Sequence, residues 1–300
     1  MDSGSADFWI GGEGCQSDAG GDCVRTISSQ LIRSRSDLTR FLTTQGKHVF
    51  LGSQASSSFQ DSGKSFQVTY GSGAVQGNII ADNVNIAGLA LDKHIFGVAL
   101  VESQDFSNDT TKFDGLIGLA QSSLSNQGVL TPVEALAKQG SITEAITSYK
   151  LSRVSSGVND GEITFGGLDQ SKFDPNTLVS FANVNKQGFW EGDLTASVNG
   201  QDLGLQGRTA ILDTGTTLII APAADAAAVH AKIPGAKSDG QGGFTIPCTN
   251  TAVVSLTFGG QAFDINPTDL LFSPVDPNNL QGDCISGISS GTIGGPQQWL

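Results

Sequence analysis

The sequence predicts a mostly β fold of two lobes related by a pseudo-twofold repeat, with a few short helices. Charged residues make up only 15% of the 300 residues, and 39 residues are glycine. This composition is typical of strands joined by many turns. A short motif, Asp-Ser/Thr-Gly-Ser/Thr, occurs at residues 2–5 and again at residues 213–216. One copy in each half of the chain indicates an internal repeat.

Strands are predicted where short apolar or alternating runs lie between clusters of glycine, serine, asparagine and aspartate. These runs are residues 65–70, 78–86, 94–101, 162–165, 251–258 and 262–265. Two helices are predicted as well. Thr131, Pro132 and Glu134 have the spacing of a capping box with proline in the first turn. The alanine-rich residues 222–232 form the second helix, which a Pro-Gly pair ends.

Charge and residue content exclude several classes of protein. A net charge of −13 would repel phosphate groups, so we expect no nucleic-acid partner. The three histidines are scattered and no Cys-x-x-Cys pair occurs, so we expect no metal and no cofactor. No apolar run approaches the roughly 20 residues that a membrane span needs. We also expect no signal peptide in this sequence.

Four cysteines, in two groups, bear on the compartment. They are Cys15, Cys23, Cys248 and Cys284. Of the three possible connectivities, local pairing of Cys15 with Cys23 and of Cys248 with Cys284 is the simplest, and it implies an oxidising compartment. Four buried free thiols are the alternative. Asn108-Asp109-Thr110 is an N-glycosylation sequon, short enough to arise by chance.

Each copy of the repeated motif places one carboxylate in a tight glycine turn, with a hydroxyl three residues after it. Either copy alone would be an ordinary turn sequence. The first continues into Trp9 and the second into an apolar run, residues 217–220. These matched flanks favour a functional interpretation, in which Asp2 and Asp213 face each other across a pseudo-twofold axis.

With these flanks, the chain resembles the pepsin-like aspartic endopeptidases, and most of all their secreted fungal members. The resemblance lies in residues 2–9, 213–217, the hairpin 68–73, and two further stretches at 113–120 and 161–169. It implies a bilobal double β-barrel. The N-terminal lobe, residues 1–170, would hold the first catalytic turn and a flap hairpin. The C-terminal lobe, residues 171–300, would hold the second catalytic turn.

The resemblance implies hydrolysis of peptide bonds through a water molecule activated by Asp2 and Asp213. Two carboxylates held close together cannot both ionise easily, so one keeps a proton. The ionised carboxylate would accept a proton from the water, and the protonated one would donate to the carbonyl oxygen. Activity at acid pH is expected.

Further site residues follow from the same resemblance. Ser5 and Thr216 would donate hydrogen bonds to the two aspartates, and Ser3 and Thr214 would bind the opposite loop. Tyr70 would close over the substrate and hydrogen-bond toward Trp9. The remaining substrate-binding or supporting residues are Gly4, Gly71, Ser72, Phe106, Phe189, Gly215 and Thr217.

Partners and location are implied by the family. We expect polypeptide substrates, pepstatin-type inhibitors, a monomer, and secretion, with the vacuole as the alternative. A non-catalytic binding protein of the same fold and an inactive fragment remain alternatives in function. Such binding proteins usually lack an aspartate or the flap tyrosine, and this chain has Asp2, Asp213 and Tyr70.

Two features depart from the family. Family members carry additional segments before the first turn and after the position of Leu300, so we expect a chain truncated at both ends and impaired in folding and activity. Residues 24–47 are rich in basic residues. They are interpreted as a basic binding loop, or as a solvated insertion or an amphipathic helix around residues 36–42. A further interpretation is that residues 24–45 are a retained intron.

Overall fold

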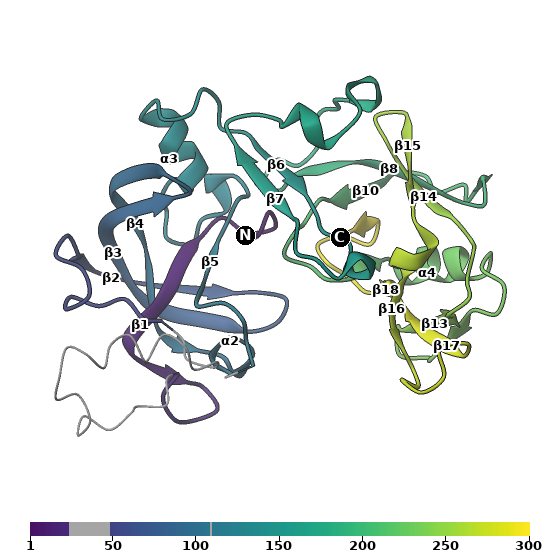
Figure 1. Cartoon of the computed structure of the whole chain (residues 1–300), viewed down its shortest axis with the longest axis horizontal. Helices are drawn as coiled ribbons and strands as arrows, with labels where there is room; N and C mark the ends of the chain where they lie inside the picture. The colour runs from purple at the N-terminus through teal and green to yellow at the C-terminus, as the bar shows by residue number, and fades with distance from the viewer. Residues whose placement is uncertain (24–48, 109) are drawn as a thin grey trace. The chain divides into compact units, whose positions relative to one another are not determined.

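The computed structural model describes residues 1–23, 49–108 and 110–300 (Figure 1). The insert predicted at residues 24–45 lies outside the described residues. The chain divides into two compact units. The first comprises Met1–Thr147 with Phe165–Gly167, and the second comprises Ser148–Thr164 with Leu168–Leu300. The functional division at residue 170 stays a prediction.

The first unit is built on a five-stranded sheet with the strand order β2-β3-β4-β1-β5. Its strands are β1 (Phe8–Ser17), β2 (Gln60–Thr69), β3 (Ala74–Ile86), β4 (Leu89–Glu102) and β5 (Gly115–Ile117). β1 runs parallel to β4 and antiparallel to β5. Trp9 thereby lies opposite Gly97 on one neighbour and Leu116 on the other. The strand that follows the first motif copy is therefore paired on both sides.

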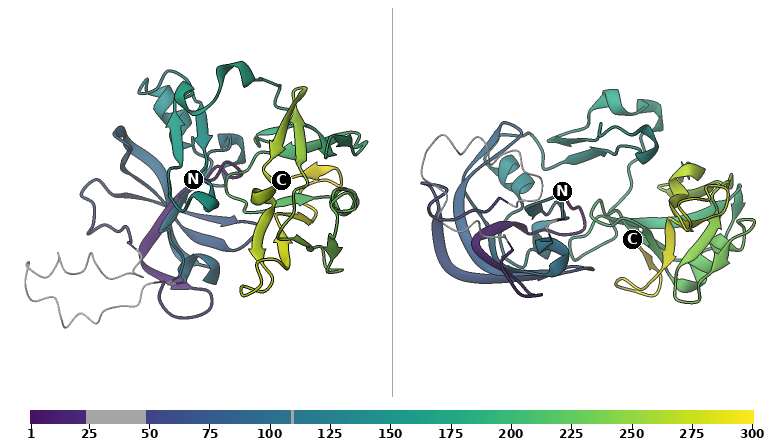
Figure 2. Two further views of the ribbon diagram at one scale, coloured as in Figure 1. Left: turned by 45° about the vertical axis from the view of Figure 1, so that its right-hand side comes forward. Right: turned by 60° about the horizontal axis from the view of Figure 1, so that its bottom comes forward.

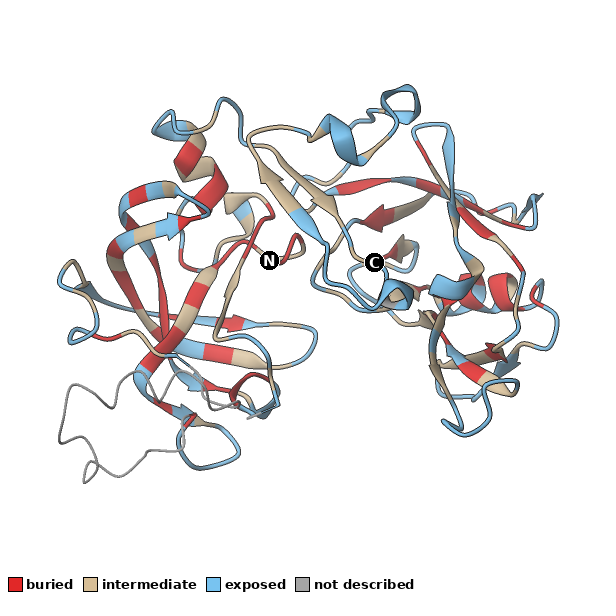
Figure 3. Cartoon of the chain, in the orientation of Figure 1, coloured by how far each residue is buried: buried red, intermediate tan, exposed pale blue. Residues whose placement is uncertain are grey.

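Alternation along β1 and β4 gives this sheet two apolar faces. Figure 3 colours the buried residues along these strands red. One face carries Trp9, Phe66, Val68, Val75, Ile79 and Ala99, and Phe106, from outside the sheet, joins this cluster. The opposite face carries Ile80, Phe96 and Val98, with Phe8 packed against them. Successive side chains of a strand point to opposite faces, so adjacent residues such as Phe8 and Trp9 stabilise different clusters.

The described residues of the first unit also form three short helices: α2 (Gln104–Ser107), the 3-10 helix η1 (Ser122–Leu124) and α3 (Pro132–Lys138). The predicted capping box is confirmed, because Thr131 accepts from the Glu134 amide and the Glu134 side chain accepts from the Thr131 amide. α3 packs beside β4, as the views in Figure 2 show. α2, which carries Phe106, was not predicted from the sequence.

The second unit contains several smaller sheets. The largest has the strand order β15-β14-β8-β10-β19, and β9 also pairs with β8. Its strands are β8 (Glu191–Val198), β9 (Gln201–Asp202), β10 (Arg208–Ile211), β14 (Val254–Phe258), β15 (Gln261–Ile265) and β19 (Gln298–Trp299). A four-stranded sheet, in the order β12-β13-β17-β16, consists of β12 (Lys237–Ser238), β13 (Phe244–Pro247), β16 (Leu271–Pro274) and β17 (Asp283–Ser286).

Two-stranded sheets form the rest of the β structure. β11 (Ile219–Ala221) pairs in parallel with β18 (Ile288–Ser290). β6 (Thr147–Lys150) pairs with β7 (Glu162–Phe165). The remaining helices are α4 (Ala223–His230) and the 3-10 helices η2 (Val154–Ser156), η3 (Gln170–Lys172), η4 (Pro175–Thr177) and η5 (Pro267–Leu270). The predicted strands and the alanine-rich helix are therefore all present, with bounds shifted by a few residues.

One apolar cluster holds the second unit together. Val229 of α4, Val254 of β14, Ile288 of β18 and Trp299 of β19 are almost fully buried in it. Disulfides join Cys15 to Cys23 in the first unit and Cys248 to Cys284 in the second. This is the local pairing that the sequence favoured, and it leaves no free cysteine.

Candidate active site

Asp2 forms a turn in which its own carboxylate is the acceptor. The Gly4 amide donates to Oδ1 at 2.9 Å, and the Ser5 hydroxyl donates to Oδ2 at 2.5 Å. A side chain that accepts from the amide two residues ahead is an Asx turn. Asp2 is 7% exposed, and both donors fix the orientation of its carboxylate. Asp2 is thus a buried, oriented carboxylate.

The backbone of this turn is held against the end of β5. The Asp2 amide donates to the Ile117 carbonyl at 3.0 Å, and the Leu119 amide donates to the Asp2 carbonyl at 2.7 Å. Gly118 makes the close approach possible, because a Cβ there would lie 2.6 Å from the Asp7 nitrogen. The Phe-Asp-Gly-Leu-Ile-Gly stretch recognised in the sequence is therefore the support of the first turn.

Asp7 is a further anchor that the sequence analysis missed. It is 1% exposed, and four donors from residues 125–127 reach its carboxylate. They are the Ser125 hydroxyl at 2.8 Å, the Asn126 amide at 3.0 Å, the Asn126 side-chain nitrogen at 2.8 Å and the Gln127 amide at 3.0 Å. Because these partners lie about 120 positions along the chain, no local pattern could have revealed them. The anchor fixes the segment between Asp2 and β1.

Trp9, Tyr70 and Phe106 form an aromatic cluster beside this segment. The Trp9 indole N–H donates to the Tyr70 hydroxyl at 2.7 Å, which places the predicted bond in the structure. The Tyr70 and Phe106 rings meet edge to face at 5.5 Å, and Phe106 also packs on Trp9 at 5.5 Å. These contacts hold the base of the β2–β3 hairpin, whose tip carries Gly71 and Ser72 exposed to solvent.

Tyr70 stays protonated in this setting. Burial raises the pKa of its hydroxyl above the ordinary value of 10, although the hydrogen bond from Trp9 lowers it, and the nearby carboxylates of Asp7 and Asp2 raise it further. The Tyr70 oxygen accepts from Trp9, and the hydroxyl keeps its own proton. It remains a neutral donor at acid and neutral pH.

Asp213 repeats the geometry of Asp2 in the second unit. The Gly215 amide donates to Oδ1 at 2.7 Å, and the Thr216 hydroxyl donates to Oδ2 at 2.6 Å. The same two atoms of the aspartate accept from the same relative positions as in the first turn. Asp213 follows β10 closely and precedes β11. Two copies of one turn are therefore present, one in each unit.

The strands around the two turns repeat as well. Trp9 and Ile220 each lie seven residues after the aspartate. Trp9 pairs with Leu116, and Ile220 exchanges both backbone hydrogen bonds with Leu300, at 2.8 and 2.9 Å. The strand that follows each turn also runs parallel to a second strand, β4 in one unit and β18 in the other. The repeat thus includes the supports of both turns.

The other predicted site residues differ in how far they are buried. Ser3 is buried, Thr214 and Phe189 are half-buried, and Thr217 is exposed. Two asparagine side chains hold the backbone of Phe189. Its amide donates to the Asn185 side chain, and its carbonyl accepts from the Asn183 side chain. Their predicted roles in the opposite loop or in a substrate pocket stay predictions.

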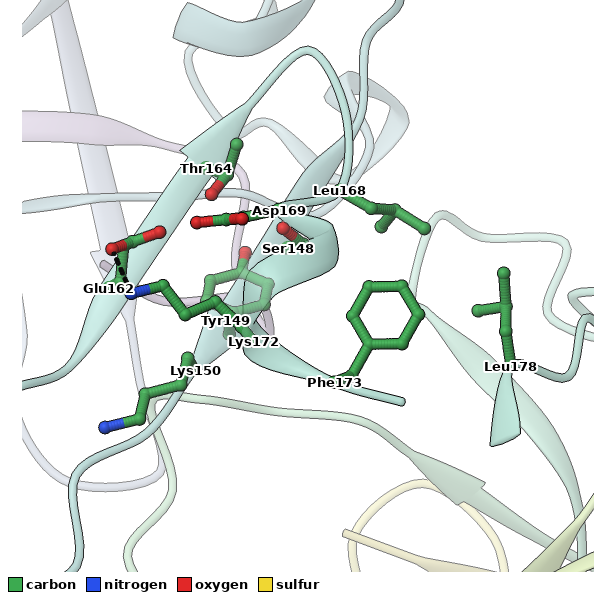
Figure 4. A pocket seen from close by; sticks show the side chains of 10 residues that line it. All are labelled: Ser148, Tyr149, Lys150, Glu162, Thr164, Leu168, Asp169, Lys172, Phe173 and Leu178. Carbon is green, nitrogen blue, oxygen red and sulfur yellow. Dashed lines mark ion pairs between the residues drawn. The ribbon is translucent and has the colours of Figure 1, made fainter. Parts of the chain in front are cut away.

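Two cavities of the second unit lie away from Asp213. One, of about 340 Å³, is lined by β6, β7 and residues 168–178. Figure 4 shows Glu162 and Lys172 pointing at each other in it, joined by a 2.9 Å ion pair, with Phe173 and Leu178 on the other side. The second, of about 660 Å³, borders β8 and Arg208. Neither is lined by a predicted site residue.

The described residues bring together one trio of possible metal ligands, Cys15, Cys23 and Glu102. Both sulfurs of this trio belong to the disulfide, so they are not available as thiolate ligands. None of the helices in the described part of the chain has the length and apolar character needed to cross a bilayer.

Comparison with known proteins agrees with the paired turns. Residues 1–298 match the family model of the eukaryotic aspartyl proteases. The probable aspartic-type endopeptidase CTSD of Trichophyton verrucosum is 36% identical over 85% of this chain and 48% of its own length. Aspartic-type endopeptidase ctsD of Aspergillus fumigatus is 34% identical over 85% of this chain and 52% of its own.

Rhizopuspepsin-1 of Rhizopus niveus is 35% identical over 81% of this chain and 61% of its own length. The chain thus spans about half to three fifths of the length of these relatives. The mostly β pepsin-like fold class expected from the sequence is confirmed. Since the match extends over nearly all of the sequence and includes both aspartate turns, the chain belongs to the eukaryotic aspartyl protease family.

Proposed function

We propose that this protein is an aspartic endopeptidase in which Asp2 and Asp213 act on one water molecule. The observation that carries the proposal is the repeated turn, in which the glycine amide holds Oδ1 of each aspartate and the hydroxyl three residues on holds Oδ2. A solvent-activating carboxylate needs a fixed orientation, and both turns supply it.

The chemistry follows from two carboxylates that share one proton. The ionised aspartate accepts a proton from the water, whose oxygen then bonds to the carbonyl carbon of the peptide. The protonated aspartate donates its proton to the carbonyl oxygen, so a neutral tetrahedral intermediate forms. Proton transfer to the amide nitrogen then lets the C–N bond break. No residue becomes covalently bonded to the substrate.

The hairpin tip is the proposed clamp on the substrate. Gly71 and Ser72 are exposed, so their backbone groups can pair with an extended peptide as an added strand does. Tyr70 is fixed below them by Trp9 and Phe106. Phe106 and Phe189 are the proposed apolar walls for bulky side chains near the scissile bond.

Inhibitor sensitivity tests this mechanism, because no residue forms a covalent bond with the substrate. The protein should cleave an unfolded polypeptide at acid pH, and pepstatin should stop the cleavage, whereas covalent reagents directed at serine or cysteine should leave it unchanged. Inhibition by a serine- or cysteine-directed alkylating reagent with pepstatin inactive would contradict the proposal.

The proposed setting is outside the cytosol. Two disulfides support an oxidising compartment, and the fungal relatives support secretion, with the vacuole as the alternative. We propose that the protein acts as a monomer on polypeptides and binds pepstatin-type inhibitors.

A further inference from the structure

We propose that Asn108 is an N-glycan acceptor. Asn108 ends α2, and its exposed side chain belongs to the sequence Asn-Asp-Thr. The sequence contains one other Asn-x-Ser/Thr triplet, at Asn266, but proline occupies its central position and prevents glycosylation. Asn108 is therefore the single acceptor that the sequence offers.

The local geometry suits the modification. The Thr110 amide and the Thr110 hydroxyl both donate to Oδ1 of Asn108, at 3.0 and 3.1 Å. A glycan is attached to Nδ2, so neither bond is lost when the sugar is present. The Asn108 backbone is extended, with φ −75° and ψ 136°. The acceptor and its hydroxyl partner are thus already arranged in the folded protein.

Thr111, which follows the triplet, makes two hydrogen bonds to the end of α2. The Thr111 amide donates to the Asn108 carbonyl at 2.8 Å, and the Thr111 hydroxyl donates to the Asp105 carbonyl at 2.9 Å. Two residues before Asn108, the buried Phe106 packs on Tyr70. A glycan on Asn108 would leave this packing unchanged, because the asparagine side chain is exposed. The sugar would then border the helix that supports the proposed flap.

The secretory route supplies the enzyme and the sugar donor for this step. The amide nitrogen of Asn108 displaces the lipid-linked diphosphate from the first sugar of the oligosaccharide, so a C–N bond forms while the C–O bond to the phosphate breaks, and the amide proton is released. The proposal therefore requires entry into the endoplasmic reticulum, which the disulfides support. It does not require peptidase activity.

The test is translation of the full chain behind a cleavable signal sequence in the presence of microsomes. We expect one shift in electrophoretic mobility that endoglycosidase H reverses. Asn108→Gln and Thr110→Ala should abolish the shift, whereas Thr110→Ser should keep it. Release by peptide N-glycosidase in ¹⁸O water should convert Asn108 to a labelled aspartate.

Asn266 provides the matched control. It is also exposed, and its Oδ1 also accepts from the amide two residues on, at 3.0 Å, so it differs from Asn108 mainly in the proline. Asn266→Gln should change nothing, and Pro267→Ala should add a second shift. An unshifted wild-type chain alongside a shifted Pro267→Ala variant would overturn the proposal, as would a shift that persists in Asn108→Gln. Peptide hydrolysis by Asn108→Gln, measured separately, reports on the proposed function alone.

Discussion

The Thr216 hydroxyl donates a 2.6 Å hydrogen bond to Oδ2 of Asp213. In the first unit, Ser5 has the same relation to Asp2 at 2.5 Å. A hydroxyl that donates to a carboxylate favours its ionised form and fixes its orientation. Each proposed catalytic carboxylate therefore accepts a hydrogen bond from a neutral hydroxyl group.

Thr216→Val tests this role, because valine keeps the shape of threonine and removes the donor. A hydrogen bond to a charged group contributes about 1.5–3 kcal/mol, so kcat should fall roughly 10- to 100-fold. Thr195→Val, on the exposed face of β8, is the control and should keep wild-type activity. Equal kcat values for Thr216→Val and wild type would show that the hydroxyl does not contribute to catalysis.

Tyr70→Phe should destabilise the first unit. The substitution keeps the ring packed on Phe106 but leaves the indole N–H of the buried Trp9 without its acceptor. An unsatisfied buried donor costs about 1–3 kcal/mol, which urea unfolding can measure. The chain has one other tyrosine, Tyr149, and Tyr149→Phe is the matched change outside this cluster. A variant as stable as wild type would show that the Trp9 bond contributes nothing.

Asp7→Ala should lower the free energy of unfolding more than a substitution of either proposed catalytic aspartate does. It leaves four donors of residues 125–127 without their acceptor. Since an unsatisfied buried donor costs about 1–3 kcal/mol, the free energy of unfolding should fall by about 3 kcal/mol or more. Asp276→Ala removes an exposed aspartate that accepts from the Asn278 amide, and it should change stability by about 1 kcal/mol or less. Similar losses in the two variants would contradict the anchoring role of Asp7.

His94 should make the first unit less stable in acid. Burial lowers the pKa of its imidazole from 6.5 to about 4, and Nε2 has no hydrogen-bond partner among the described residues. The unfolded chain therefore binds the proton more readily than the folded one. Stability is fully present above pH 6.5 and falls as the pH drops toward 4, by at most about 3 kcal/mol.

His94→Phe separates this effect from other titrations. The new ring can pack beside Phe8 and Phe96, which stack on each other at 4.5 Å and whose centroids lie 6.1 and 6.3 Å from the imidazole. The free energy of unfolding should decline less between pH 6.5 and 4 in the variant than in wild type. His230 is unchanged in both proteins, so its own burial-lowered pKa cancels in the comparison. Parallel declines would contradict the assignment to His94.

Local patterns predicted much of this fold. The Thr131 capping box, the alanine-rich α4 and the alternating runs of β3, β4 and β14 are defined by residues close together in the sequence. Both aspartate turns were also predictable, because the Asx and hydroxyl bonds of Asp2 and Asp213 span only two or three positions.

Long-range pairing could not be predicted in the same way. The parallel pairing of β1 with β4 and the anchor of Asp7 on residues 125–127 join segments roughly ninety to 120 positions apart. Alternation in β1 predicts which face Trp9 occupies but not which strand lies beside it. From its sequence neighbours alone, Asp7 would be expected to be a solvent-exposed charge. Only the tertiary structure shows that Asp7 is buried and that its carboxylate is fully hydrogen-bonded.

Peptide hydrolysis by the Asp2→Asn and Asp213→Asn variants tests the central proposal most directly. Asp276→Asn is the control, since Asp276 forms the same type of Asx turn as Asp2 and Asp213. Both of the first two variants should lose hydrolysis at acid pH by roughly a thousandfold or more, while the control should match wild type. Retention of wild-type rates by either Asp2→Asn or Asp213→Asn would contradict a mechanism that requires one carboxylate from each turn.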